Sequence, residues 1–168
     1  LIATLNERPF GGNIASYRTF INSIDGVGGV QVYPTWSGGG TVKCSVIGAD
    51  FMPASPTLVE QVQIAVDPPP NQGLGLGTAP IGAKVTVTAP EPVTVDVSAK
   101  LALAPGYSIA QVQPLVERAL ESYLLDIRRA WAVPVNATTN QYASDVYLSR
   151  VLAAIVGATG VINATSAM

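Results

Sequence analysis

The chain has 168 residues, of which 48% are hydrophobic and only 12% are charged, and its formal net charge is −2. An ordinary soluble domain carries about twice this share of charged residues. The chain has no histidine and a single cysteine, Cys44. These counts exclude Ser-His-Asp and Cys-His catalysis, histidine metal ligands, an intrachain disulfide and a thiolate zinc cluster.

The composition also limits the partners of the chain. Its nine basic residues are scattered, with one adjacent pair at Arg128 and Arg129, so no stripe of positive charge predicts nucleic-acid binding. The apolar stretch at 151–162 contains two glycines and is shorter than the ~20 residues that span a bilayer, so no membrane insertion is expected. The weakly charged surface suits a protein covered by neighbours, although average solubility is an equal explanation. The sequence starts with Leu1, and we interpret it as the C-terminal fragment of a longer protein.

In the first half, two helices and a hairpin are predicted. Apolar residues at helical spacing predict a helix over 14–24, with Asn13 as its N-cap. Residues 41–46 alternate apolar and polar side chains, as a half-buried strand does, and Ser37–Gly40 reads as the loop joining this strand to the preceding one. Ser55 followed by proline begins a second helix that runs to Val66, before a Gly/Pro-rich loop over 68–83.

In the second half, the same reasoning predicts a hairpin, two helices and a final short strand. Residues 85–89 and 93–103 alternate as strands. Ser108 and Gln111 form a capping-box pattern at the start of a long helix over 108–127. A last helix is expected over 144–156, burying Tyr147 and Leu148 among others, and a glycine closes it.

These elements indicate an α+β fold in which helices cover one face of mostly antiparallel or mixed sheets in two layers. A helix, a Gly-Val pair and a short strand occur at 13–34 and again at 144–165. We therefore expect two similar small lobes, at 1–80 and 81–168. The alternative is one α+β domain whose elements look alike because amphipathic elements generally do.

No catalytic or ligand-binding constellation is found. The glycine series from Gly73 to Gly82 has neither dinucleotide-binding nor P-loop spacing, and it precedes a strand where those motifs link a strand to a helix. A long Gly/Pro-rich connection is better explained as a loop that contacts another subunit. Trp36 beside the hairpin loop is expected to be buried, with an interface anchor as the alternative. The candidate interface residues are Trp36, Gly38, Gly39, Gly40, Asn71, Gln72, Gly73, Leu74, Gly75, Leu76 and Gly77.

Several segments resemble the baseplate J-like proteins of contractile phage tails, most closely the branch found in PBSX-type defective prophages. They are GGNIASYRTFINSIDGVGGVQVYPTWSGGGTVK at 11–43, the helix SPTLVEQVQIAVDP at 55–68, and NQGLGLGTAPIGAKVTVTA at 71–89. The long helix from Tyr107 to Trp131 is similar to the one that follows in the PBSX-type branch. GATGVINAT near the end resembles its closing element more loosely.

The resemblance implies a structural protein without enzymatic activity, catalytic residues, cofactor, metal or small-molecule substrate. Such proteins are wedge components of the baseplate, which hold the sheath extended and transmit the trigger for contraction. The implied partners are other baseplate and tail proteins and neighbouring copies in a ring. The implied location is the virion tail, assembled in the host cytoplasm. The alternative function is a regulatory α+β module that binds a small molecule between the two lobes.

Overall fold

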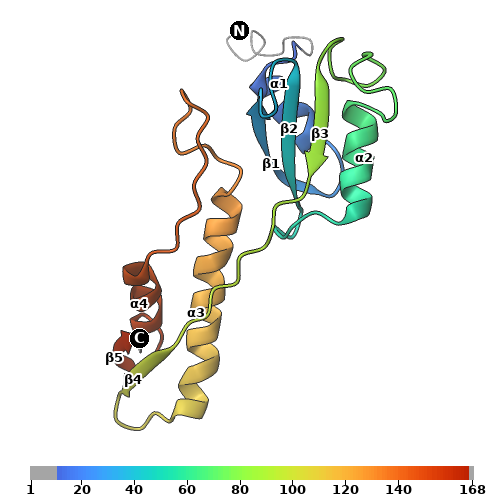
Figure 1. Ribbon diagram of the computed structural model, residues 1–168. Helices are drawn as coiled ribbons and strands as arrows, with labels where there is room; N and C mark the ends of the chain where they lie inside the picture. The colour runs from blue at the N-terminus through green and yellow to red at the C-terminus, as the bar shows by residue number, and fades with distance from the viewer. Residues whose placement is uncertain (1–10, 167–168) are drawn as a thin grey trace, which may run out of the picture. The chain divides into compact units, whose positions relative to one another are not determined.

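The computed structural model describes residues 11–166 and confirms the α+β class (Figure 1). The chain forms two compact units, one up to Pro92 and the other from Val93. This division falls later than the one expected between residues 80 and 81. Within residues 11–166, the structure contains no helix that is both long and apolar enough to cross a membrane.

The first unit combines two helices with a three-stranded sheet. Its elements are α1 (Ile14–Asn22), β1 (Val27–Pro34), β2 (Thr41–Gly48), α2 (Pro56–Val66) and β3 (Lys84–Thr88). The sheet order is β1-β2-β3; β1 pairs antiparallel with β2, and β2 pairs parallel with β3. The sheet is therefore mixed, as the sequence predicts.

Local sequence accounts for the positions of both helices. The Asn13 side chain accepts the Ser16 backbone N–H at 2.8 Å and caps α1. The Ser55 hydroxyl accepts the Leu58 backbone N–H at 3.2 Å, and the proline that follows occupies the first turn of α2. The core lies between these helices and one face of the sheet, with Tyr17, Ile21, Val30, Val32, Cys44, Val46, Val62, Val66, Val85 and Val87 among its buried side chains.

The expected hairpin between 85–89 and 93–103 does not form. Residues 84–88 are instead β3, which joins the first sheet after the crossover through α2. Parallel pairing requires such a crossover, and α2 supplies it by packing on the sheet. The strand that sequence reasoning assigned to the second lobe thus belongs to the first unit.

The second unit has the expected order of strand, helix, helix and strand. It contains β4 (Ala99–Leu103), α3 (Ile109–Ala130), α4 (Leu148–Val156) and β5 (Val161–Ser166), with β4 and β5 antiparallel. The Gln111 side chain accepts the Ser108 backbone N–H at 2.9 Å at the start of α3, as the capping-box pattern predicts. The core of this unit is formed by Val112, Val116, Val151, Ile155, Ala158 and Ala164.

Two predicted elements in this unit are too long. The predicted strand over 93–103 is a strand only over Ala99–Leu103, and within residues 11–166 its pairing with β5 begins at Ala99 opposite Ser166. The predicted helix over 144–156 begins at Leu148, and Tyr147 is its N-cap residue in an extended conformation. The side chains of Tyr147 and Leu148 are exposed, so their predicted burial is wrong.

Candidate interaction surface at one end of the first unit

The two loops that carry the candidate interface residues meet at one end of the first sheet. Because β2 and β3 are parallel, both strands begin at that end, with Thr41 paired to Lys84. The hairpin loop at 35–40 leads into β2, and the Gly/Pro-rich loop at 68–83 leads into β3 (Figure 1). The Lys84 backbone N–H donates to the Gly40 carbonyl at 2.8 Å and ties the two loops together. We call residues 35–40 and 68–83 the loop end.

The hairpin loop is internally hydrogen-bonded. The Thr35 N–H donates to the Thr41 carbonyl at 2.7 Å, and the Thr41 hydroxyl donates to the Gly38 carbonyl at 2.7 Å. Trp36 is 49% exposed, which corrects the expectation of burial. The Lys43 ammonium lies 5.7 Å from the centre of the Trp36 ring. This distance is within the range of a cation–π interaction, which holds the indole at the surface of the tip.

The glycine-rich loop is fixed by side chains that satisfy the backbone of β3. The Asp67 carboxylate, 1% exposed, accepts the N–H groups of Gly73 and Val85, each at 2.9 Å. Gln63 accepts the Val87 N–H at 2.8 Å, and the Gln72 amide donates to the Val85 carbonyl at 2.8 Å. β3 is an edge strand, and these contacts occupy backbone groups that an edge would otherwise leave open.

The predicted interface residues of this loop therefore have different roles. Gln72 and Gly73 anchor the loop. Gly77 is required for packing, since a Cβ atom there would lie 2.4 Å from the Val66 carbonyl oxygen. By contrast, Leu74 and Leu76 are 60% and 64% exposed.

One exposed residue of this loop is not among the individually named candidates. Ile81 lies in the predicted contact loop and is 85% exposed. A Cβ atom on Gly75 would approach the Ile81 side chain to 2.7 Å, so the two sides of the loop are in close contact. Leu74, Leu76 and Ile81 thus place three solvent-exposed aliphatic side chains on one ordered loop. An isoleucine in a Pro-Ile-Gly turn was the available signal, because a turn offers such a side chain little to pack against.

The second unit has a separate open depression of about 370 Å³. It lies between α3 and the segment that contains β4 and the residues just before it. Its lining is mostly apolar, with Ser98, Gln113 and Glu117 as polar members. Val97, Leu101, Val116 and Ile155 are among the apolar members. Among residues 11–166, no cluster of three or more His, Cys, Asp or Glu side chains could hold a metal ion.

The thiol of Cys44 is unreactive near neutral pH. Its side chain is fully buried in the first core, and this burial raises the pKa of the thiol from 9.0 to about 12. Burial also raises the pKa of the neighbouring Tyr17 phenol to about 12, with smaller contributions from Cys44 and Asp67. A thiol reacts as its thiolate, so Cys44 is protonated and unreactive near neutral pH. Cys44 is therefore a structural cysteine of the first core.

Comparison with protein-family models finds two adjacent matches that together span most of the chain. Residues 9–89 match the Baseplate J-like central domain. Residues 95–165 match the Baseplate J-like protein C-terminal domain. The boundary between the matches coincides with the boundary between the two structural units.

Curated relatives agree with the family models. The chain is 38% identical over 111 residues to the phage-like element PBSX protein XkdT of Bacillus subtilis (strain 168), an alignment that covers 66% of the chain and 31% of that protein. It is 43% identical over 105 residues to the uncharacterized protein YqbT of the same organism, covering 62% of the chain and 30% of YqbT. It is 39% identical over 88 residues to baseplate protein gp47 of Escherichia phage Mu, covering 49% of the chain and 24% of gp47. The alignments thus span less than a third of each relative. With the two domain models matched in order along the chain, this protein belongs to the baseplate J-like family.

Proposed function

We propose that this chain is a structural component of a phage or phage-like tail baseplate. In this role it contacts other tail proteins and neighbouring copies of itself, and it acts in tail assembly and in transmitting the trigger for contraction. The proposal is supported by the two consecutive family matches and by the name of the phage Mu relative, a baseplate protein.

The single structural observation that supports an assembly role is the loop end of the first unit. Three exposed aliphatic side chains and a half-exposed tryptophan are displayed there on loops whose backbones are fixed by hydrogen bonds. A preformed apolar surface loses little conformational entropy when a partner covers it. Weak contacts of this kind add up when many copies assemble in a closed particle. We propose that the loop end is a contact surface with another baseplate subunit.

The role is tested by mass spectrometry of phage-like particles purified from an induced culture of the source bacterium. Peptides of this chain, such as the tryptic peptide ending at Arg118, should copurify with sheath and tube proteins at a fixed, low stoichiometry. Particles that form while this protein stays in the soluble fraction would contradict the proposal.

A regulatory module that binds a small molecule is the competing function. The observation that favours it is the depression of about 370 Å³, large enough for a small ligand. The depression is open and lies within the second unit, and the Gln113 amide in its lining already donates to the Glu117 carboxylate at 2.8 Å. A thermal-shift screen with common metabolites distinguishes the two functions, because a regulatory module should be stabilised by one of them. We expect no stabilisation.

A further inference from the structure

The segment Val93–Val97 has the sequence of a strand, and no strand within residues 11–166 lies beside it. Its valines alternate with Thr94 and Asp96, and Val93, Val95 and Val97 are 87%, 38% and 40% exposed. Within residues 11–166, no hydrogen bond involves its backbone. The segment leads into β4 without a turn or helix (Figure 1). A row of free N–H and C=O groups that continues an existing strand is a template for another strand.

We propose that Val93–Val97 pairs antiparallel with the same segment of a second copy of this chain, with Val95 opposite Val95. The pattern Val-x-Val-x-Val reads the same in both directions. In this register, Val93 lies opposite Val97 and all valines share one face, because residues directly opposite in an antiparallel pair point to the same side. The two-fold axis makes the contact isologous, so the pair closes on itself.

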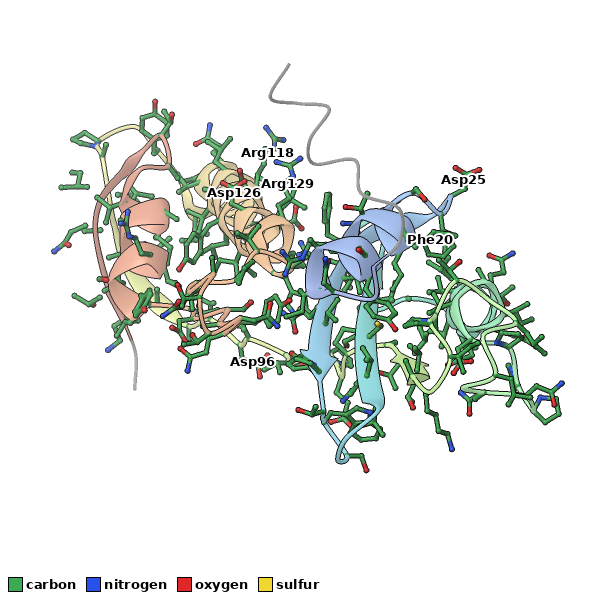
Figure 2. The ribbon with its side chains drawn as sticks, turned by 90° about the horizontal axis from the view of Figure 1, so that it is seen from above. Phe20, Asp25, Asp96, Arg118, Asp126 and Arg129 are labelled. Atoms are coloured by element: carbon green, nitrogen blue, oxygen red, sulfur yellow. The ribbon has the colours of Figure 1, made fainter. Side chains whose placement is uncertain are left out.

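The polar residues of the segment agree with this register. Asp96 projects from the segment (Figure 2) and lies opposite Thr94 of the second copy, so no two carboxylates are directly opposed. Pro90 and Pro92 precede the segment and have no N–H group to donate. Proline is found at strand ends and ends a ladder, so the pairing is confined to Val93–Val97.

The proposed pairing also reaches one edge of the depression in the second unit. Val97 is part of its lining, together with Leu101 and Ile109. In the proposed register, Val93 of the second copy lies opposite Val97 of the first. Val93 of the second copy therefore covers the edge of the depression that Val97 forms. Of the three valines in the segment, Val93 is the most exposed, and it gains most from this contact.

This inference rests on the proposed function, since it specifies how neighbouring copies contact one another. Five paired residues bury far less than the ~1,000 Å² of a stable isolated interface. The contact is therefore weak and transient in solution, and it becomes stable when a particle holds many copies in place. A test of it must trap a weak complex.

Cross-linking through an introduced cysteine tests the register directly. In the proposed pair, the Cα atoms of opposed residues are about 4.5–5.5 Å apart, which suits a disulfide. The purified Val95→Cys variant should form a disulfide-linked dimer under mild oxidation. Val93→Cys is the matched control, because Val93 is more exposed but lies opposite a different residue. Cys44 does not compete, since it is buried and protonated.

We expect the dimer yield of Val95→Cys to exceed that of Val93→Cys by about tenfold, because only the first places two cysteines within disulfide range. A mixture of Val93→Cys and Val97→Cys should form a cross-linked heterodimer. Equal or greater yield from Val93→Cys alone would mean random collision and would overturn the inference.

The same variants, oxidised inside purified particles, separate this inference from the baseplate role. If the particles contain the protein but give no Val95→Cys cross-link, the result agrees with the proposed function and contradicts the strand pairing. If the purified protein is cross-linked but is not incorporated into particles, the result supports the strand pairing and contradicts the baseplate role.

Discussion

The side-chain carboxylate of Asp67, at the C-terminal end of α2, accepts a hydrogen bond from the Val85 backbone N–H at 2.9 Å, across eighteen positions of sequence. The same carboxylate accepts the Gly73 N–H at 2.9 Å. One buried side chain thus fixes the edge strand β3 and the loop that displays Leu74 and Leu76. The Gly/Pro-rich loop at 68–83 is thus anchored by a carboxylate buried in the first unit.

Replacing this anchor should destabilise the first unit. In Asp67→Asn, an amide N–H₂ group faces one of the two backbone N–H donors, so one buried donor loses its acceptor. We expect a loss of at least about 2 kcal/mol in the free energy of unfolding. Urea unfolding followed by Trp36 fluorescence in a Trp131→Phe background measures the first unit alone.

Asp50→Asn is the control for that measurement. Asp50 is exposed, and its carboxylate accepts a single N–H, from Met52, at 3.0 Å. Its replacement should cost less than about 1 kcal/mol. Equal losses in the two variants would show that the buried carboxylate is not the anchor of β3.

Two glycines in the loop end should respond in opposite ways to alanine. The Cβ atom of Gly77→Ala would lie 2.4 Å from the Val66 carbonyl oxygen, so we expect a destabilisation of about 1–3 kcal/mol. The Cβ atom of Gly39→Ala would meet nothing within 4 Å, so that variant should be neutral or slightly more stable. Thermal unfolding of both variants against the parent checks the prediction, which fails if Gly39→Ala is the less stable of the two.

The exposed aliphatic residues of the loop end should be needed for assembly and dispensable for folding. A triple variant, Leu74→Ser with Leu76→Ser and Ile81→Ser, should retain the parent's unfolding midpoint because these side chains are 60–85% exposed. It should be incorporated into particles at least about tenfold less, since apolar contacts carry most of the binding energy of such a surface.

Met52→Ser is the matched control for the triple variant. Met52 is 43% exposed and lies in the turn after β2, at the other end of the sheet. It should be incorporated normally. Normal incorporation of the triple variant, measured by quantitative mass spectrometry of the particles, would exclude the loop end as an interface.

The stability of the first unit should fall at high pH. Folding raises the pKa of Cys44 from 9.0 to about 12 and that of Tyr17 from 10.0 to about 12. Between pH 9 and pH 12 the unfolded chain binds fewer protons than the folded one, so the free energy of unfolding decreases as the pH rises. This stabilisation is complete below pH 9 and is lost as the pH rises toward 12.

The contribution of Cys44 can be separated by substitution. Cys44→Ala should lower stability at neutral pH, because it leaves a small cavity, and should show a shallower decline above pH 9. Urea titrations at several pH values measure both effects. Native Cys44 should also resist alkylation at pH 8 and react quickly in urea. Rapid native alkylation would contradict its burial.

The sequence by itself determined the helices α1, α2 and α3, the β1–β2 hairpin, and the absence of histidine and disulfide chemistry. Asn13, Ser55 and the Ser108–Gln111 pair set the helix starts through contacts a few residues away, and such local contacts can be read from the order of residues. The family resemblance was also present in the sequence, and the family models confirm it.

Only the tertiary structure decided which strands pair and which residues of the loops are exposed. Alternation makes both 84–88 and 93–98 plausible strands, but a strand forms only where a neighbour satisfies its backbone, and that neighbour is distant in sequence. β2 provides one for residues 84–88, and residues 11–166 provide none for Val93–Val97. The parallel pairing of β2 with β3 also brings the two candidate loops to one end of the sheet. The hydrogen bonds of Asp67 and Gln72 to Val85 determine which residues of the glycine-rich loop act as anchors and which side chains remain exposed. Pairing and burial depend on contacts between segments far apart in the chain, which the local pattern of residues does not specify.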